Sequence, residues 1–267
     1  MTLTGQASHA DPVLLLHGQP GGARDWDLVV AALDRRVQTI ALDRPGWDGR
    51  SAPRDLPGNA WSALGALDAA GADRATVVGH SFGAAVAAWL CTAHPERVTA
   101  LVLLAPAVNE ASLQWIDHWL AAPVVGPLLS VAALAGPGVA LASPQLRDRV
   151  GSRLGLDADY LRAAARMLRS PWAWRSFLVE QRALIVQLPA LESRLSQIAV
   201  PTTIVIGSAD RVVPPASAKL LGRQIRGAAL VPLRRAGHLL SRQHAERIAE
   251  ITLSAATRGR VQAPGPG

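Results

Sequence analysis

Ser81 is the residue of this chain whose surroundings most clearly indicate chemistry. It stands in the stretch TVVGHSFGAAVAAW, with Gly79 and Gly83 two positions away on either side. A serine at the apex of a strand-to-helix turn adopts a strained backbone, and flanking glycines remove the side chains that would collide there. The exposed hydroxyl becomes a nucleophile when a histidine, oriented by a carboxylate, takes its proton. We therefore interpret Ser81 as a nucleophile rather than a helix cap, which would not require glycine on both sides.

The elements that must position Ser81 follow an alternating pattern. Apolar runs begin at Val13, Val37, Ala75 and Val98, and continuous runs of this length are typical of strands buried on both faces. Helices are expected between them over residues 25–35, 60–70 and 82–93. The pattern returns with strands from Pro201 and Ala228 and helices over 216–225 and 241–255. The sequence thus predicts an α/β fold, a mostly parallel central sheet flanked by helices.

Residues 108–199 interrupt this alternation with Leu, Ala, Arg and Trp at helical spacing. We expect residues 1–107 and 200–257 to form one core, residues 108–199 to form a helical insertion, and residues 258–267 to form a disordered tail. The stretch from Trp119 to Leu146 has no charged residue. Prolines and glycines at 123, 126, 127 and 136–138 are expected to break it into pieces too short to cross a bilayer.

In this setting, GHSFG resembles the nucleophile turn of the α/β-hydrolase superfamily, and the resemblance extends from about Val13 to Ala255. It implies the chain order Ser, Asp, His. His238, in RRAGHLL, follows the last expected strand, where the superfamily carries its catalytic histidine. Asp210, in GSADRVVP, stands in a loop that resembles the superfamily's acid loop. Glu110, after LVLLAP, is the reserve for the acid, because some relatives place it there.

The stretch LLLHGQPGG resembles the HGxP loop of the superfamily, which supplies a backbone N–H to the oxyanion hole. The matching donors are the N–H groups of Gln19 and Phe82. Pro20 is expected to fix the loop, and His17 to brace it rather than to move protons. Haloalkane dehalogenases and epoxide hydrolases share such a loop but use an aspartate nucleophile, so Ser81 argues against both. The sequence has no metal, P-loop or dinucleotide motif, and we expect neither a cofactor nor a metal.

By the same resemblance, residues 108–199 are a cap, or lid, that covers the site and selects the substrate. Five tryptophans are expected at the substrate pocket, with ordinary packing as the alternative; they are Trp47, Trp115, Trp119, Trp172 and Trp174. The apolar lid also suggests contact with lipid. Relative to the family pattern, Asp48 looks like an insertion, the helix before Ala75 looks short, and the short segment before Val13 suggests that the sheet lacks one strand.

The favoured function is that of an esterase-like serine hydrolase that cleaves an apolar carboxylic ester through an acyl-enzyme. The same three residues also support C–C bond hydrolysis, lactone hydrolysis and cofactor-free perhydrolysis, and the sequence does not separate these reactions. A second class of function, a non-catalytic ligand-binding protein with this fold, would be favoured by loss of one of the three residues, and none is lost.

Charge and cysteine content bear on partners and compartment. The net charge is +7 and the pI is about 11.1, yet the arginines are scattered, so no nucleic-acid partner is expected. Cys91 is the single cysteine, which rules out an intrachain disulfide. The opening MTLTGQASHADP does not have the pattern of a secretory signal, and a cytoplasmic location is expected. The sequence does not indicate an oligomeric state.

Overall fold

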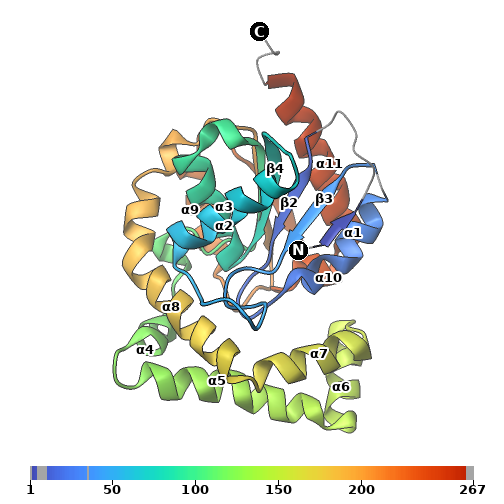
Figure 1. Cartoon of the computed structure of the whole chain (residues 1–267), viewed down its shortest axis with the longest axis vertical. Coiled ribbons are helices and arrows are strands. Elements are labelled where there is room, and N and C mark those ends of the chain that lie inside the picture. Colours follow the sequence, from blue (N-terminus) through green and yellow to red (C-terminus); the bar gives the residue numbers. More distant parts are fainter. Residues whose placement is uncertain (1, 5–10, 35, 263–267) are drawn as a thin grey trace.

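A seven-stranded sheet runs through the centre of the protein (Figure 1). The structure, a computed structural model, describes residues 2–4, 11–34 and 36–262. The strands lie in the order β1-β3-β2-β4-β5-β6-β7; β1 pairs antiparallel with β3, and every other pair is parallel. The predicted α/β fold with a mostly parallel sheet is confirmed. The strands are β1 (Thr2–Thr4), β2 (Val13–Leu16), β3 (Thr39–Leu42), β4 (Ala75–His80), β5 (Val98–Leu104), β6 (Thr202–Gly207) and β7 (Ala229–Leu233).

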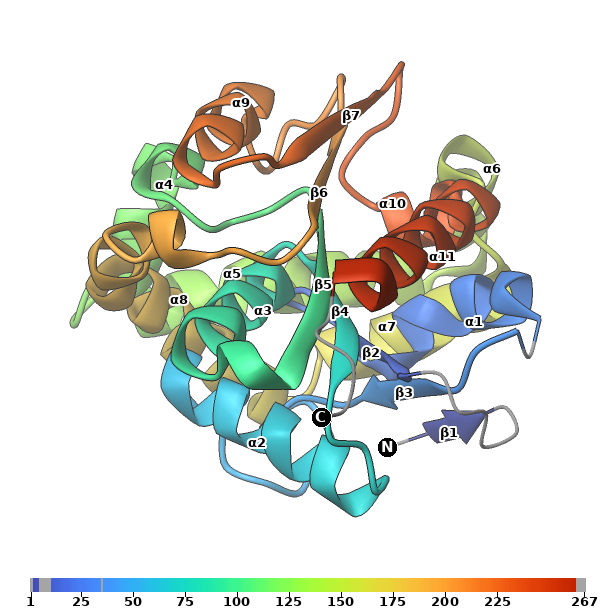
Figure 2. The ribbon, with the colours of Figure 1, turned by 90° about the horizontal axis from the view of Figure 1, so that it is seen from above.

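Helices cover both faces of the sheet (Figure 2). One face carries α2 (Leu56–Ala69), α3 (Phe82–Ala93) and α9 (Pro215–Gln224), and the other carries α1 (Asp27–Leu33), α10 (Leu240–Gln243) and α11 (Ala245–Gln262). Alternate strand residues therefore enter different cores, because successive side chains of a strand point to opposite faces. Leu14 and Val77 pack in the α2–α3 core, whereas Leu15 and Val78 pack in the α1–α11 core.

Two helix boundaries correct the expectations. The helix before β4 is not short: α2 has 14 residues and begins at Leu56, because the Asp55 carboxylate caps it by accepting the Gly58 N–H at 3.0 Å. At the other end of the chain, α11 continues through Gln262, so residues 258–262 are helical rather than part of a disordered tail. Arg258 donates to the Thr203 hydroxyl at 2.9 Å, and Gly259 packs closely on the Thr99 carbonyl. Residues 263–267 and His9 lie outside the described residues.

Five helices follow β5 and precede β6, and together they form the helical insertion (Figure 1). They are α4 (Trp115–Ala121), α5 (Gly126–Ala142), α6 (Pro144–Leu154), α7 (Ala158–Leu168) and α8 (Pro171–Glu192); short 3-10 turns occur at Ala23–Trp26, Pro95–Arg97, Glu110–Ser112 and Leu195–Gln197. The apolar run does break between α4 and α5, but α5 passes through Pro137 without interruption, contrary to expectation. The packing of Gly138 against Leu168 and Arg169 holds this part of α5 close to the end of α7.

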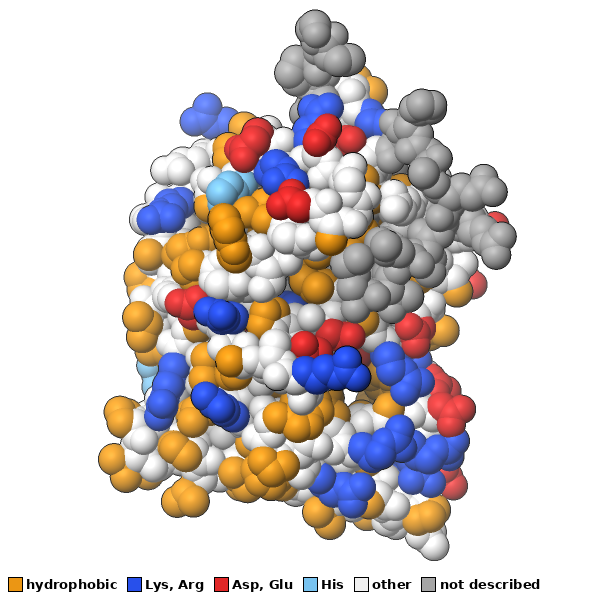
Figure 3. All heavy atoms as spheres, viewed as in Figure 1, with side chains coloured by type: hydrophobic (Ala, Val, Ile, Leu, Met, Phe, Trp, Pro, Cys, Tyr) orange, Lys and Arg blue, Asp and Glu red, His pale blue; other side chains and the backbone are white. Residues whose placement is uncertain are grey.

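The outer surface of α4 and α5 is apolar in places. Figure 3 shows hydrophobic side chains over the insertion, interspersed with arginines; the exposed large ones on these helices and the turn between them include Trp115, Trp119, Val124, Leu128 and Val139. Among the described residues no single helix has the length and apolar character of a membrane span, although α4 and α5 meet those criteria as a pair bent by 111°. Lipid contact stays a prediction.

Candidate active site

The turn between β4 and α3 holds Ser81 in a strained backbone conformation. Its φ is +54°, a region that residues with a side chain rarely adopt. A Cβ on Gly79 would collide with the Gly83 carbonyl, and one on Gly83 would collide with the Leu16 carbonyl on the neighbouring strand. The two glycines are thus required by close backbone contacts, which is the reason the sequence pattern could indicate the turn.

His238 and Asp210 are brought together from the loops after β7 and β6. The Nδ1 atom of His238 lies 2.8 Å from the Asp210 carboxylate. Burial tends to raise the pKa of Asp210, but the hydrogen bond and charge of His238 outweigh it, helped by the N–H groups of Val212 and Val213, so the pKa is lowered. An ionised Asp210 favours the His238 tautomer with the proton on Nδ1, which leaves Nε2 free to accept a proton.

His80, beside the nucleophile, connects Ser81 to the histidine loop. Its Nε2 atom lies 2.8 Å from the His238 carbonyl, and the two imidazole rings are 4.8 Å apart. Burial, followed by the nearby charge of His238, lowers the pKa of His80 to about 3. Glu110, the reserve acid, is exposed, and its N–H donates to Glu192 in the insertion. Of the two candidate acids, Asp210 is therefore the one that contacts His238.

The loop after β2 packs directly against the nucleophile. A Cβ on Gly18 would lie 3.1 Å from the Ser81 Cβ, so glycine is needed for this close approach. His17 is fully buried; its Nδ1 lies 2.7 Å from the Gly18 carbonyl, and its Nε2 accepts the Arg44 N–H at 3.0 Å. Burial and the Arg44 charge hold the His17 pKa well below its ordinary value. A neutral, fully hydrogen-bonded imidazole matches the bracing role expected for His17.

Ser81 opens into a cavity of about 620 Å³ between the core and the insertion. Its walls are mainly apolar: Pro20, Ala107, Leu113, Ile116, Leu120, Ala133, Leu134, Pro137, Leu168, Phe177, Leu184, Val212 and Val213. The charged side chains in its lining are those of Asp117 and Arg211. Asp117 already accepts hydrogen bonds from Gln181 Nε2 and the Gln114 N–H. The cavity thus fits an uncharged, apolar group next to the nucleophile.

A second cavity, of about 340 Å³, lies beside His80 and His238. It shares Gln19, Pro20, Leu168 and Val212 with the first cavity. Asp25, Tyr160 and Arg242 form its polar end; the Tyr160 hydroxyl donates to Asp25 at 3.0 Å, and the Arg242 guanidinium lies 4.3 Å from the centre of the Tyr160 ring. The two cavities therefore meet at these four shared residues.

None of the five predicted tryptophans lines the Ser81 cavity, so this expectation needs correction. Trp115 and Trp119 are 74% and 55% exposed, because they occupy one face of α4 while Ile116 and Leu120 face the cavity. Trp47 and Trp172 line a cavity of about 180 Å³ that shares Asp25, Tyr160, Ala164 and Met167 with the second cavity. Trp174 packs within the insertion, where its indole donates to the Leu168 carbonyl at 2.7 Å. Asp48 accepts the Arg50 and Ser51 N–H groups and so closes the turn after Trp47.

Sequence reasoning did not single out three residues that border the site: Arg44, Glu180 and Gln181. Arg44 and Glu180 form a fully buried ion pair, and Gln181 accepts a hydrogen bond from the Gln19 side chain at 2.7 Å. Arg44 lies four positions before Asp48, the apparent insertion, but its partner is 136 positions away. Within the described part of the chain, no group of three or more His, Cys, Asp or Glu side chains is arranged to hold a metal ion.

The sheet order, the strained serine turn and the His238–Asp210 pair define a class of protein. The model of the alpha/beta hydrolase family matches residues 13–251, and the chain belongs to this family. It is 28% identical over 255 residues to 2-hydroxy-6-oxononadienedioate/2-hydroxy-6-oxononatrienedioate hydrolase 2 of Pseudomonas putida, with 91% of this chain and 87% of that protein covered. It is 29% identical over 253 residues to 2-hydroxymuconate semialdehyde hydrolase of Pseudomonas sp. strain CF600, with 90% and 84% covered.

Solved structures have the same fold. A meta-cleavage product hydrolase from Pseudomonas fluorescens IP01 superposes with a TM-score of 0.71 at 22% identity, covering 96% of this chain and 93% of that one. A thermophilic esterase from Thermogutta terrifontis superposes with a TM-score of 0.74 at 19% identity, covering 97% and 92%. Both likenesses concern the fold alone.

Proposed function

We propose that the protein is a serine hydrolase that cleaves a carboxylic ester with an apolar acyl part through an acyl-enzyme. The observation that carries the proposal is the position of Ser81, at the head of an apolar cavity and next to His80, which contacts the loop of the hydrogen-bonded His238–Asp210 pair. The helical insertion acts as a cap, since α4, α5, α7 and α8 supply most of the apolar wall. Catalysis by these residues requires no metal or cofactor.

His238 Nε2 takes the Ser81 proton as Oγ attacks the carbonyl carbon, and Asp210 stabilises the imidazolium that forms. The N–H groups of Gln19 and Phe82 stabilise the oxyanion of the tetrahedral intermediate. His238 then returns the proton to the departing alcohol. Water, activated by the same imidazole, releases the acid from Ser81 in the second half of the reaction.

Hydrolysis of a C–C bond is the second candidate, because relatives over most of the chain are named hydrolases of 2-hydroxymuconate semialdehyde and 2-hydroxy-6-oxononadienedioate. The second of these substrates is a dicarboxylate, so it carries negative charge. The Ser81 cavity offers an anion the exposed Arg211 and also contains the carboxylate of Asp117. In the adjoining cavity, Arg242 lies with Asp25 and is paired with Asp157. Repulsion by Asp117 favours a neutral ester over a dicarboxylate in this cavity.

The test is labelling with a fluorophosphonate, together with turnover of p-nitrophenyl esters of graded acyl length and of 2-hydroxymuconate semialdehyde. We expect wild type to be labelled and to hydrolyse the esters, and Ser81→Ala to lose both activities, with kcat reduced by about 10³-fold or more. Faster turnover of the semialdehyde than of any ester would instead favour C–C hydrolysis. A folded wild type that neither labels nor turns over any of these substrates would favour the ligand-binding alternative.

A further inference from the structure

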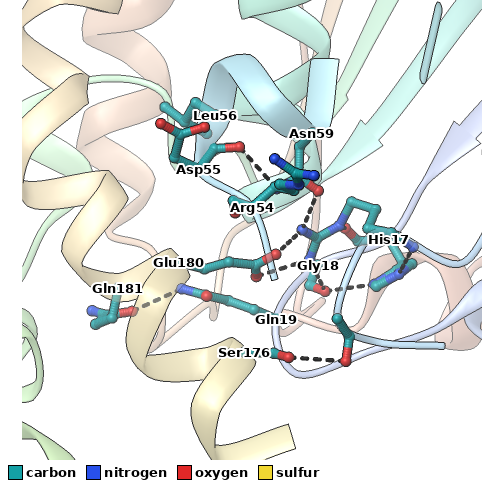
Figure 4. A network of polar contacts seen from close by, with 12 residues as sticks. His17, Gly18, Gln19, Arg54, Asp55, Leu56, Asn59, Ser176, Glu180 and Gln181 are labelled. Atoms are coloured by element: carbon teal, nitrogen blue, oxygen red, sulfur yellow. Dashed lines mark hydrogen bonds and ion pairs between the residues drawn. The ribbon is translucent and has the colours of Figure 1, made fainter. Parts of the chain in front are cut away.

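We propose that Arg44 is a positioning residue for the oxyanion hole and that Glu180, from the helical insertion, holds it in place. The inference rests on the proposed function, in which Gln19 and Phe82 donate to the oxyanion. It assigns a role in the reaction to a buried ion pair that joins the core to the insertion. Figure 4 shows Glu180 on α8 close to Gly18 and Asn59, which lie on two different parts of the core.

The Arg44 side chain uses every N–H group that it has. Nε donates to the His17 carbonyl at 2.8 Å and Nη2 donates to the Gly18 carbonyl at 2.9 Å. Nη1 donates to Asn59 Oδ1 at 3.2 Å and to the Glu180 carboxylate, and Nη2 donates to Glu180 Oε2 at 3.1 Å. Five donors with five acceptors fix the planar guanidinium in one orientation. Arg44 therefore holds two successive carbonyls of the loop that packs on Ser81.

The contact with the Gly18 carbonyl bears directly on catalysis. In a trans peptide the carbonyl of Gly18 and the N–H of Gln19 lie in one plane and point in opposite directions. The Gly18 oxygen contacts both Arg44 Nη2 and His17 Nδ1, at 2.9 and 2.7 Å, which fixes this plane and hence the direction of the Gln19 N–H. A charged donor on the carbonyl also polarises the amide and strengthens the hydrogen bond that its N–H can donate.

Arg44 also contacts the residue that supplies the second oxyanion donor. Its guanidinium carbon lies 4.6 Å from the centre of the Phe82 ring, within the range of a cation–π interaction. Phe82 is fully buried at the first position of α3. One guanidinium thus contacts Phe82 and the Gly18 carbonyl, which belongs to the same peptide group as the Gln19 N–H. A purely structural ion pair would not need both contacts.

The insertion supplies the carboxylate that this arrangement requires. Arg44 and Glu180 are both 0% exposed, and an unpaired buried guanidinium would be strongly unfavourable. The next residue on α8, Gln181, accepts from the Gln19 side chain at 2.7 Å. Two successive residues of α8 are therefore linked to the loop after β2, Glu180 through Arg44 and Gln181 through the Gln19 side chain (Figure 4). The contacts that hold the insertion on the core therefore also align the oxyanion donors.

The experiment compares Arg44→Lys and Glu180→Gln with Gln187→Ala, all in the full-length enzyme. Gln187 lies on the same helix and also bonds to the core, where its Oε1 accepts the Leu56 N–H and its Nε2 donates to Asp55, both at 2.9 Å. Neither bond involves Arg44, Glu180 or the loop after β2. We expect kcat for a p-nitrophenyl ester to fall 10- to 100-fold in the first two variants, with KM within about threefold, because both half-reactions pass through an oxyanion. Gln187→Ala is expected to keep the wild-type kcat.

A second readout separates positioning from a general loss of stability. Binding of a trifluoromethyl ketone, which forms an oxyanion on Ser81, should weaken by about the same factor as kcat, while binding of the matching unreactive ether should not change. If a single variant does not fold, the double variant Arg44→Met/Glu180→Met replaces the pair by apolar groups and should fold with the same loss of kcat. Folded variants with wild-type kcat, or with a change confined to KM, would overturn the inference while wild-type activity still supports the proposed function. A wild type without Ser81-dependent turnover would defeat both.

Discussion

At the scale of single residues, the site combines a strained serine with two histidines that burial keeps neutral. Ser81 is held at a positive φ by close backbone contacts on both sides. Burial keeps His17 and His80 neutral at ordinary pH, and His238 is the imidazole that we propose as the base for Ser81. Asp210 is the carboxylate that contacts it. The arrangement thus distinguishes the proposed base, His238, from two neutral histidines that bond to loop backbone.

Asp25, at the polar end of the second cavity, is a partly buried acid whose pKa shift has a measurable consequence. Burial raises its pKa to about 6, against the opposing hydrogen bonds from the Gly22 N–H and the Tyr160 hydroxyl. A carboxyl whose pKa is higher in the folded state stabilises the fold at low pH and loses that contribution as pH rises through its folded pKa. We expect the wild-type unfolding free energy to fall by roughly 2 kcal/mol relative to Asp25→Asn between pH 4 and pH 7.

Urea unfolding of wild type and Asp25→Asn across this pH range measures the difference. Tyr160→Phe provides a second variant, because loss of the hydroxyl bond that lowers the Asp25 pKa should move the transition to higher pH. If the unfolding free energies of wild type and Asp25→Asn change with pH by the same amount, the prediction is wrong.

At the scale of elements, the faces of the insertion helices decide which side chains meet the substrate. On α4, Ile116 and Leu120 are one turn apart and line the Ser81 cavity, whereas Trp115 and Trp119 are also one turn apart and are exposed. On α5, Leu134 and Pro137 line the same cavity, and Gly138 packs against α7. The helical repeat thus divides each helix into a cavity face and an outer or packing face.

Enlarging the cavity at α4 should change the preferred acyl length. Ile116→Ala removes part of the cavity wall, so kcat/KM for p-nitrophenyl octanoate should rise roughly three- to tenfold relative to the butyrate, since one methylene in an apolar pocket has an effect of this order. Trp115→Ala, one residue away and exposed, is the matched control and should leave the ratio unchanged. Equal shifts in the two variants would argue that the cavity face of α4 is not the acyl site.

Two glycines in helices should respond in opposite directions to alanine. A Cβ on Gly138 would lie 2.9 Å from both Leu168 Cβ and Arg169 Cγ, and this overpacking should cost about 1–3 kcal/mol of unfolding free energy. Gly65, on the exposed face of α2, has no atom within 4 Å of the Cβ position, and alanine there should stabilise by about 0.5–1 kcal/mol. Denaturant unfolding of both variants measures this. A stable Gly138→Ala protein would show that α5 and α7 can move apart.

At the scale of the whole molecule, the sheet and its two helical layers form a support and the insertion closes the site above it. Ser81, Asp210 and His238 follow β4, β6 and β7, so the carboxyl ends of parallel strands bring residues from distant parts of the chain to one edge. Core and insertion are then joined across the site by Arg44 and Glu180, and by Arg242 with Asp157 at 2.6 Å. These ion pairs therefore fix the insertion to the core, although the insertion is one continuous segment of the sequence.

The end of α11 is also fixed to the core. A chain that ends at Thr257 loses the Arg258–Thr203 hydrogen bond and the contact of Gly259 with Thr99 on β5. We expect its unfolding free energy to be about 1–2 kcal/mol lower than that of a chain ending at Gln262. Thermal or urea unfolding of the two proteins measures the effect. Equal stability of the two proteins would indicate that residues 258–262 contribute nothing to the fold, as expected of the disordered tail that the sequence suggested.

The sequence by itself determined the strands around Ser81, the helix over residues 82–93 and the turn between them, because these depend on local periodicity and on glycine at fixed positions. The resemblance that these motifs carry also selected His238 and Asp210, which the fold joins at 2.8 Å. Only the tertiary structure decided which side chains line the cavity, that Pro137 lies inside α5, and that Arg44 meets Glu180 across 136 positions. Each of these is a contact between segments distant in the chain, and local pattern carries no information about the partner that packing will bring.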